Sequence, residues 1–149
     1  MLFRSAIQAS LTGHLVLATL HTNDAPSAVT RLIDMGVEPY LLSSSLLGVQ
    51  AQRLVRKLCL ACRRQDAAGH WHPVGCPACS RSGYKGRTGV YELMLADDAI
   101  RELIHNRASD ADVTAQARLG GYRPMRDDGQ RLLAEGVTSL EEVLRVTRD

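Results

Sequence analysis

Residues 59–79 read CLACRRQDAAGHWHPVGCPAC, and this stretch determines how the middle of the chain can fold. It contains two CxxC pairs, in which two intervening residues let one tight turn present both sulfurs to the same ion. The thirteen residues 63–75 between the pairs are enough for the second turn to fold back on the first. Four thiolates placed in this way complete a tetrahedral site for Zn²⁺. We therefore predict a structural zinc site with four ligands: Cys59, Cys62, Cys76 and Cys79.

The composition around this motif favours a metal-dependent fold. Residues 59–86 are rich in Cys, Gly, Pro, Arg and His and almost empty of large apolar side chains, so they cannot bury a core of their own. His70 and His72 lie in the spacer and are alternative ligands, although four sulfurs already fill the site. A closed site leaves no position for a catalytic water, which indicates a scaffolding role. The competing interpretations are four buried thiols without metal, and a redox CxxC, which would need a thioredoxin-like βαβ pattern.

The overall composition is that of an ordinary soluble globular protein. The chain has 149 residues, of which 45% are hydrophobic and 23% charged. Its formal net charge of +2 argues against a strongly basic nucleic-acid-binding protein. No apolar run approaches the ~18 residues that a membrane span needs, and the first residues lack the apolar segment of a signal peptide. We expect an unexported chain whose cysteines are thiols or metal ligands.

The N-terminal side of the chain carries helical and extended patterns. Residues 2–10 favour a helix. The apolar run HLVLATL at residues 14–20 favours a short buried strand of an α/β sheet. A second helix is expected after Pro26, with Asp24 as its cap and Gly36 at its end.

The segments that flank the cysteine motif favour strands. Residues 46–58 alternate in the manner of a strand, and residues 87–95 form a second strand that returns to the main body. Helices follow, and their expected start signals are Asp97, Asp110, Asp127 and a capping box at residues 138–142. The chain thus divides into a core portion (1–58), a tetracysteine subdomain (59–86) and a return strand with a helical region (87–149).

The stretch LTGHLVLATLHTN at residues 11–23 closely resembles the histidine box of the type II secretion and type IV pilus ATPase family, ring-forming P-loop motors of bacterial envelope machines. The similarity continues through residues 30–39, 41–59, 83–93, 126–129 and 136–147. The CxxC pairs match the zinc subdomain of the secretion and pilus-assembly branches, and the type II secretion ATPases, the general secretory pathway E type, are the most similar. The resemblance implies an α/β fold: the C-terminal part of a RecA-like P-loop ATPase domain, with an inserted tetracysteine zinc subdomain and a helical C-terminal region.

The resemblance also implies a function and roles for three residues. The family member would be a hexameric ATPase that hydrolyses ATP, with Mg²⁺, to power protein export across the outer membrane by type II secretion. In the complete protein His21 would sense the γ-phosphate or position a water, and His14 would shape the same wall. Thr22 would support His21 by hydrogen bonding. A neutral imidazole suits this role because it can donate one hydrogen bond to a phosphate oxygen or a water.

The residues that bind the phosphates of ATP are missing from this sequence. A phosphate loop needs GxxxxGK[ST], and the lysines here, Lys57 and Lys85, do not follow a glycine. The acidic Walker B motif of the family is absent too. We therefore expect ATP and Mg²⁺ to be cofactors only of the complete protein, and the isolated chain to be inactive.

Partners and alternatives follow from the same resemblance. It implies ring neighbours of the same kind and inner-membrane secretion platform proteins, hence a cytoplasmic location at the inner membrane of a bacterium through those partners. One alternative is a type IV pilus assembly motor fragment. Another is a zinc-ribbon nucleic-acid-binding module, because arginines crowd the cysteine motif. Scarce stacking aromatics there, Trp71 and Tyr84, weigh against it, and we expect no nucleic-acid partner. A chaperone-type zinc module would need more CxxC repeats.

Overall fold

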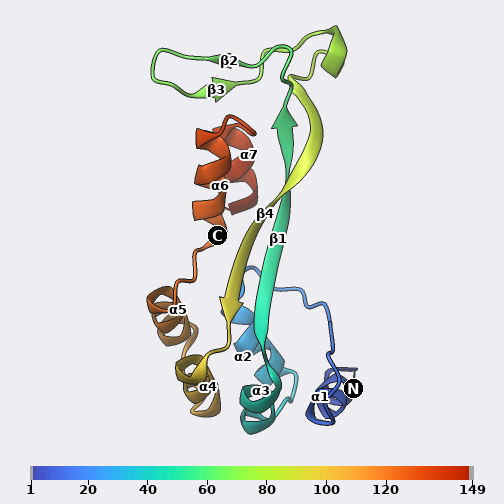
Figure 1. The fold of residues 1–149 in the computed structure, drawn as a ribbon, viewed down its shortest axis with the longest axis vertical. Coiled ribbons are helices and arrows are strands. Elements are labelled where there is room, and N and C mark those ends of the chain that lie inside the picture. The colour runs from blue at the N-terminus through green and yellow to red at the C-terminus, as the bar shows by residue number, and fades with distance from the viewer. Residues whose placement is uncertain (1, 148–149) are drawn as a thin grey trace. The chain divides into compact units, whose positions relative to one another are not determined.

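The computed structural model describes residues 2–147, which form two compact units. Unit 1 comprises Met1–Ala51 and Glu92–Arg123, and unit 2 comprises Gln52–Tyr91 and Pro124–Asp149. Two long strands, β1 (Gly48–Leu58) and β4 (Tyr84–Leu95), pair with each other in a two-stranded sheet. Their arrows run in opposite directions in Figure 1. Both predicted strands are confirmed, and each of them contributes residues to both units.

Unit 1 is helical apart from the ends of the two strands. Its helices are α1 (Leu2–Leu11), α2 (Ser27–Asp34), α3 (Pro39–Ser45), α4 (Asp98–His105) and α5 (Asp110–Leu119). Helix α3 packs against α1 and α4, and α5 packs against α2 and α4. Among residues 2–147 no helix combines the length and the apolar character that a bilayer crossing requires.

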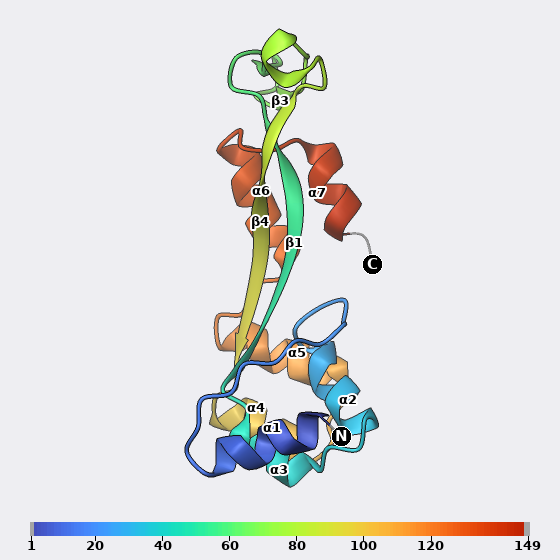
Figure 2. The same ribbon diagram turned by 90° about the vertical axis from the view of Figure 1, so that its right-hand side faces the viewer.

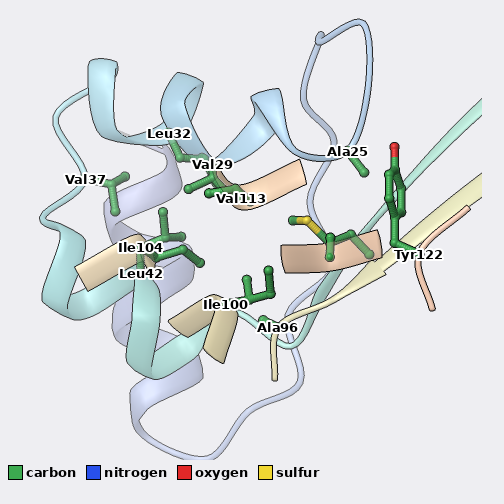
Figure 3. Close-up of a cluster of buried hydrophobic side chains, with 12 residues drawn as sticks. Ala25, Val29, Leu32, Val37, Leu42, Ala96, Ile100, Ile104, Val113 and Tyr122 are labelled. Atoms are coloured by element: carbon green, nitrogen blue, oxygen red, sulfur yellow. The ribbon is translucent and has the colours of Figure 1, made fainter. Parts of the chain in front are cut away.

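The core of unit 1 is aliphatic, as the low aromatic content requires. Leu42, Met94, Ile100 and Ile104 are fully buried and come from α3, β4 and α4. Figure 3 shows these helices converging on the cluster, with Val113 of α5 beside them. Burying each such side chain contributes about 1.5–3 kcal/mol of hydrophobic free energy.

The helix starts agree only in part with the predicted signals. The Asp97 carboxylate accepts the backbone N–H of Ile100 at 2.9 Å, which confirms it as the cap of α4. The predicted cap of α5 was wrong, because Ser109 occupies that position and Asp110 instead accepts a hydrogen bond from Thr30 of α2. A serine hydroxyl one residue earlier reaches the free N–H groups of the first turn equally well.

The predicted strand at residues 14–20 is also wrong. The segment is extended but joins no sheet, and the side chains of Leu15 and Leu17 are 76% and 89% exposed. A strand requires a neighbour to satisfy its backbone groups. Within residues 2–147 the sheets are the pair β1–β4 and the pair β2–β3, and neither extends to this segment.

Unit 2 contains the rest of the β1–β4 ribbon and two helices, α6 (Met125–Ala134) and α7 (Leu140–Thr147). It also contains the short strands β2 (Arg64–Gln65) and β3 (Trp71–His72) and the 3₁₀ turn η1 (Pro77–Cys79). Figures 1 and 2 show α6 and α7 together along this part of the ribbon. The two helices approach closely at Gly129, where an added Cβ would lie 2.6 Å from Val143 Cγ1. Helix α6 begins at Met125, two residues before the predicted start, Asp127.

A buried carboxylate attaches α7 to the ribbon. The side chain of Glu142 is fully buried and accepts hydrogen bonds from the guanidinium groups of Arg56 in β1, at 2.8 Å, and Arg145, at 2.9 Å. It also accepts the backbone N–H of Arg56 at 2.7 Å. Burial by itself raises the pKa of Glu142, but hydrogen bonds from Arg145 and Arg56 outweigh it and hold the pKa at about 2. Glu142 was expected to be a capping residue, and it instead anchors the helix.

We predict that Glu142→Gln lowers the free energy of unfolding at pH 7 by about 3 kcal/mol, because it breaks a buried ion pair. The pKa of Glu142 in the folded chain lies below its usual 4.5, so its stabilisation is complete above pH 4.5 and is lost as the pH falls towards 2. Urea denaturation at pH 7 and pH 3 measures both effects. Glu141→Gln, at the exposed neighbouring position, is the control and should resemble the unmodified chain. An equal effect of both substitutions would contradict this assignment.

Candidate functional site

The four predicted metal ligands lie together in unit 2. Cys59 follows β1, Cys62 stands at the end of the next turn, and Cys76 and Cys79 enclose η1. All four sulfurs lie within 4.8 Å of one another. The measured Sγ–Sγ distances are 3.9 Å for Cys59–Cys76 and 3.8 Å for Cys62–Cys79 and Cys76–Cys79. A tetrahedral ion with metal–sulfur bonds of about 2.3 Å requires sulfurs about 3.8 Å apart, so this cluster fits such an ion.

Backbone N–H groups point at the sulfurs of the two cysteine turns, residues 59–62 and 76–79, which together are called the knuckle. The N–H of Gly75 points at Cys62 Sγ at 3.3 Å, and those of Cys76 and Gly83 point at Cys79 Sγ at 3.2 Å. Gly75 has φ +100° and approaches so closely that an added Cβ would lie 2.5 Å from the carbonyl oxygen of Arg81. Such donors favour thiolates and orient them toward a shared ion.

The two thiols with shifted pKa values have different surroundings. Hydrogen bonding from the backbone N–H of Cys76, aided by that of Gly83 and opposed by desolvation, lowers the pKa of the Cys79 thiol to about 6. Desolvation raises the pKa of the Cys62 thiol to about 11. A metal needs the thiolate form of every ligand, so its binding must release protons and weaken as the pH falls.

The two histidines of the spacer, His70 and His72, lie beside the carboxylate of Asp66 in the β2–β3 hairpin. His72 Nε2 lies 2.8 Å and His70 Nδ1 3.7 Å from Asp66 Oδ2. The hydrogen bond with His72, together with the backbone N–H of His70, lowers the pKa of Asp66 to about 2. The structure therefore places these alternative ligands beside a carboxylate, and they are not among the four clustered sulfurs that could hold a metal ion.

The knuckle is attached to the remainder of unit 2 by backbone bonds and by one arginine. The N–H of Cys59 donates to the carbonyl of Gly83 at 2.9 Å, and that of Leu58 donates to Val137 at 2.8 Å. The Arg63 guanidinium stacks on the Trp71 ring, 4.4 Å from its centroid, and donates to the carbonyl oxygen of Gly136. Sequence reasoning missed this role of Arg63, which is one of the arginines that crowd the cysteine motif.

The aromatic side chains near the knuckle are each covered by an arginine. Arg63 lies over Trp71, and Arg56 lies 4.1 Å from the ring centroid of Tyr84. The Tyr84 hydroxyl also forms a 2.8 Å hydrogen bond with Ser139. One face of each ring is therefore covered by a guanidinium group, whereas single-strand nucleic-acid binding depends on aromatic faces that bases can stack on.

The histidines of the expected nucleotide site lie in unit 1, at the two ends of the extended segment. His14 follows α1 and its Nδ1 lies 3.2 Å from the Thr12 hydroxyl. His21 is exposed and immediately precedes a turn that leads into α2. In that turn the Thr22 hydroxyl donates to the carbonyl oxygen of Asp24 at 3.1 Å. The N-cap position of α2 is taken by Pro26 and not by the predicted Asp24, but Asp24 Oδ1 accepts the N–H of Ser27, the first residue of α2, at 2.8 Å.

Comparison with known proteins matches nearly the whole chain to one family. Residues 3–145 match the family described as "Type II/IV secretion system protein". The chain is 64% identical to "Type II secretion system protein HxcR" of Pseudomonas aeruginosa, over 97% of this chain and 30% of that protein. It is 50% identical to "Type II secretion system ATPase E" of Vibrio cholerae, over 97% of this chain and 32% of that protein. The chain therefore spans about a third of the length of these relatives.

Solved structures give the same result for the fold. The chain matches the crystal structure of the pilus retraction motor PilT with bound ADP at a TM-score of 0.70 and 26% identity, over 99% of this chain and 36% of that one. The Legionella pneumophila ATPase DotB matches in fold at a TM-score of 0.64 and 19% identity, over 97% of this chain and 34% of that one. These matches confirm the predicted fold class, part of an α/β ATPase domain, here with a tetracysteine knuckle and a helical C-terminal region. The chain belongs to the family of type II/IV secretion system proteins.

Proposed function

We propose that this chain is the C-terminal portion of a hexameric ATPase that powers protein export by type II secretion. The observation that carries the proposal is the 64% identity to a type II secretion protein over 97% of the chain. The sequence itself holds no GxxxxGK[ST] loop to bind phosphates, so hydrolysis would need residues beyond this chain. Ring neighbours and inner-membrane platform proteins are its proposed partners, which would hold it at the cytoplasmic face of the inner membrane.

A second candidate is the motor of type IV pilus assembly. The specific observation in its favour is 49% identity to "Type IV pilus assembly ATPase TfpB" of Acinetobacter baylyi, over 95% of this chain and 27% of that protein. We favour the secretion role because the identity to the secretion protein of Pseudomonas aeruginosa is higher over a similar stretch.

The proposed domain organisation comprises a core portion (1–58), a zinc subdomain (59–86), and a return strand with a helical region (87–149).

The proposed ion of the knuckle is Zn²⁺. Four thiolates are the ligand set that Zn²⁺ takes in structural sites, and the sulfur spacing suits its tetrahedral preference. When bound, the ion supplies folding free energy to residues 59–86, which bury few apolar side chains of their own. The residues Cys59, Cys62, Cys76 and Cys79 would hold it, and the N–H groups of Gly75 and Gly83 would orient their sulfurs.

The proposed nucleotide-facing residue is His21, with His14 on the same wall. His21 is exposed at the end of a segment whose following turn is held by several hydrogen bonds, so its imidazole is free to meet a ligand. A neutral imidazole can donate a hydrogen bond to a phosphate oxygen or orient a water. Thr22 is proposed to support this loop, through its hydroxyl bond to Asp24.

For the metal centre, we predict one equivalent of zinc in the purified chain by elemental analysis, and its loss in Cys76→Ser. Without the ion, residues 59–86 would keep only hydrogen bonds and ring contacts and little buried apolar surface, so trypsin should cleave there much faster. Ala78→Ser is the matched control, because it adds a hydroxyl at an exposed position between two ligands. Unchanged zinc content and unchanged cleavage in Cys76→Ser would refute the metal centre.

To test the proposed function, this chain replaces the matching region of the Vibrio cholerae ATPase. We predict that the resulting chimaera hydrolyses ATP. In the chimaera His21→Ala should lower kcat about 10²-fold, with a much smaller effect on nucleotide affinity, because the lost hydrogen bond matters most in the transition state. The isolated chain should show no ATP hydrolysis above background. Equal losses of binding and turnover, or no loss, would contradict the role of His21.

A further inference from the structure

A second buried carboxylate, Glu92 of β4, lies in unit 1 and has no part in the site as described so far. Glu92 is only 4% exposed. Its Oε1 accepts the backbone N–H of Ala25 at 2.5 Å, across 67 residues of sequence. Removing a carboxylate from water is unfavourable unless hydrogen bonds compensate for the lost hydration. This position therefore requires a reason beyond packing.

A second donor reaches the same carboxylate. Tyr122, which follows α5 and is 9% exposed, forms a side-chain hydrogen bond with Glu92. Burial, then the charge of Glu92, raises the pKa of the Tyr122 hydroxyl, so the hydroxyl stays protonated and donates. Figure 3 shows Tyr122 beside Ala25. Three segments thus meet at the side chain of Glu92: the turn before α2, strand β4, and the segment after α5 that carries Tyr122.

The turn that Glu92 holds is the one that carries the histidine. Ala25 is buried and lies four residues after His21. Between them, Thr22 and Asp24 form a compact turn closed by the bond from the Thr22 hydroxyl. Residues 14–20 join no sheet, although Leu20, directly before His21, packs against the core of unit 1. The loop is therefore held on one side by Leu20 and on the other by Ala25.

We propose that Glu92, with Tyr122, is the positioning residue for His21: it fixes the backbone from which the imidazole projects. This inference rests on the proposed function of His21. A carboxylate suits the role because both of its oxygens accept, and it receives one backbone N–H and one phenolic O–H. A glutamine of the same shape would offer one neutral accepting oxygen, so its hydrogen bond from the Ala25 N–H would lose the contribution of the carboxylate charge.

The first test is made on the full 149-residue chain by amide hydrogen exchange. Glu92→Gln should speed the exchange of the Ala25 amide about tenfold, because a hydrogen bond to a charged acceptor is replaced by one to a neutral acceptor. Tyr122→Phe should have a smaller effect of the same sign. The amide of Ile104, in the core of the same unit, reports whether the unit remains folded. Glu102→Gln, an exposed glutamate of α4, is the matched control and should change neither amide.

The second test uses turnover in the chimaera with the Vibrio cholerae ATPase. Glu92→Gln should lower kcat about tenfold with little change in KM, which a merely structural role would not do. In a His21→Ala background the same substitution should cause no further loss, because the histidine that it positions is already gone. Glu102→Gln should leave kcat unchanged.

The outcomes separate this inference from the function on which it rests. If His21→Ala impairs turnover and Glu92→Gln does not, Glu92 has no positioning role. The same conclusion follows if Ala25 exchange is unchanged in Glu92→Gln, or if the two substitutions are additive. If His21→Ala itself leaves turnover intact, the proposed role of His21 fails first, and the positioning role fails with it.

Discussion

A sheet of two strands cannot bury both of its faces, and this constraint governs how the rest of the chain is built. The strands β1 and β4 are long, but an isolated two-stranded ribbon is marginally stable in water. Each unit therefore depends on helices for its stability. In unit 1, α3 and α4 contribute to the core around Met94, and in unit 2, α6 and α7 lie along the ribbon. The apolar side chains are mostly aliphatic, and α6 and α7 approach closely at Gly129.

Buried glutamates add directional contacts to the apolar packing of both units. Glu142 joins α7 to β1 through two arginines, and Glu92 joins β4 to the turn before α2 through a backbone N–H. Both carboxylates receive donors that compensate for their desolvation, which is the condition under which a buried charge is tolerated. Such contacts specify one register between segments, whereas aliphatic surfaces can slide.

Local chemistry could be predicted from the sequence, and contacts between distant segments could not. The four cysteines, the strand at 46–58 and the Asp97 cap are set by residues close in sequence, and the structure agrees. The buried-strand composition of residues 14–20 was misleading, because a strand exists only where a neighbour pairs with it.

The roles of the two glutamates were invisible for a related reason. The residues next to Glu92 and Glu142 in the sequence do not indicate that these carboxylates bind partners 67 and 86 residues away. Alternation in β4, with Val90, Glu92 and Met94 buried, was the available clue, since a charged residue on the buried side of a strand requires a partner.

The exposed segment at residues 14–20 has a consequence for the chain handled by itself. An extended run of apolar, β-branched residues that pairs with no strand is a template for strand addition by any other chain, including a second copy. Covering Leu15 and Leu17 would remove this template, because their side chains are the most exposed large apolar groups of the segment.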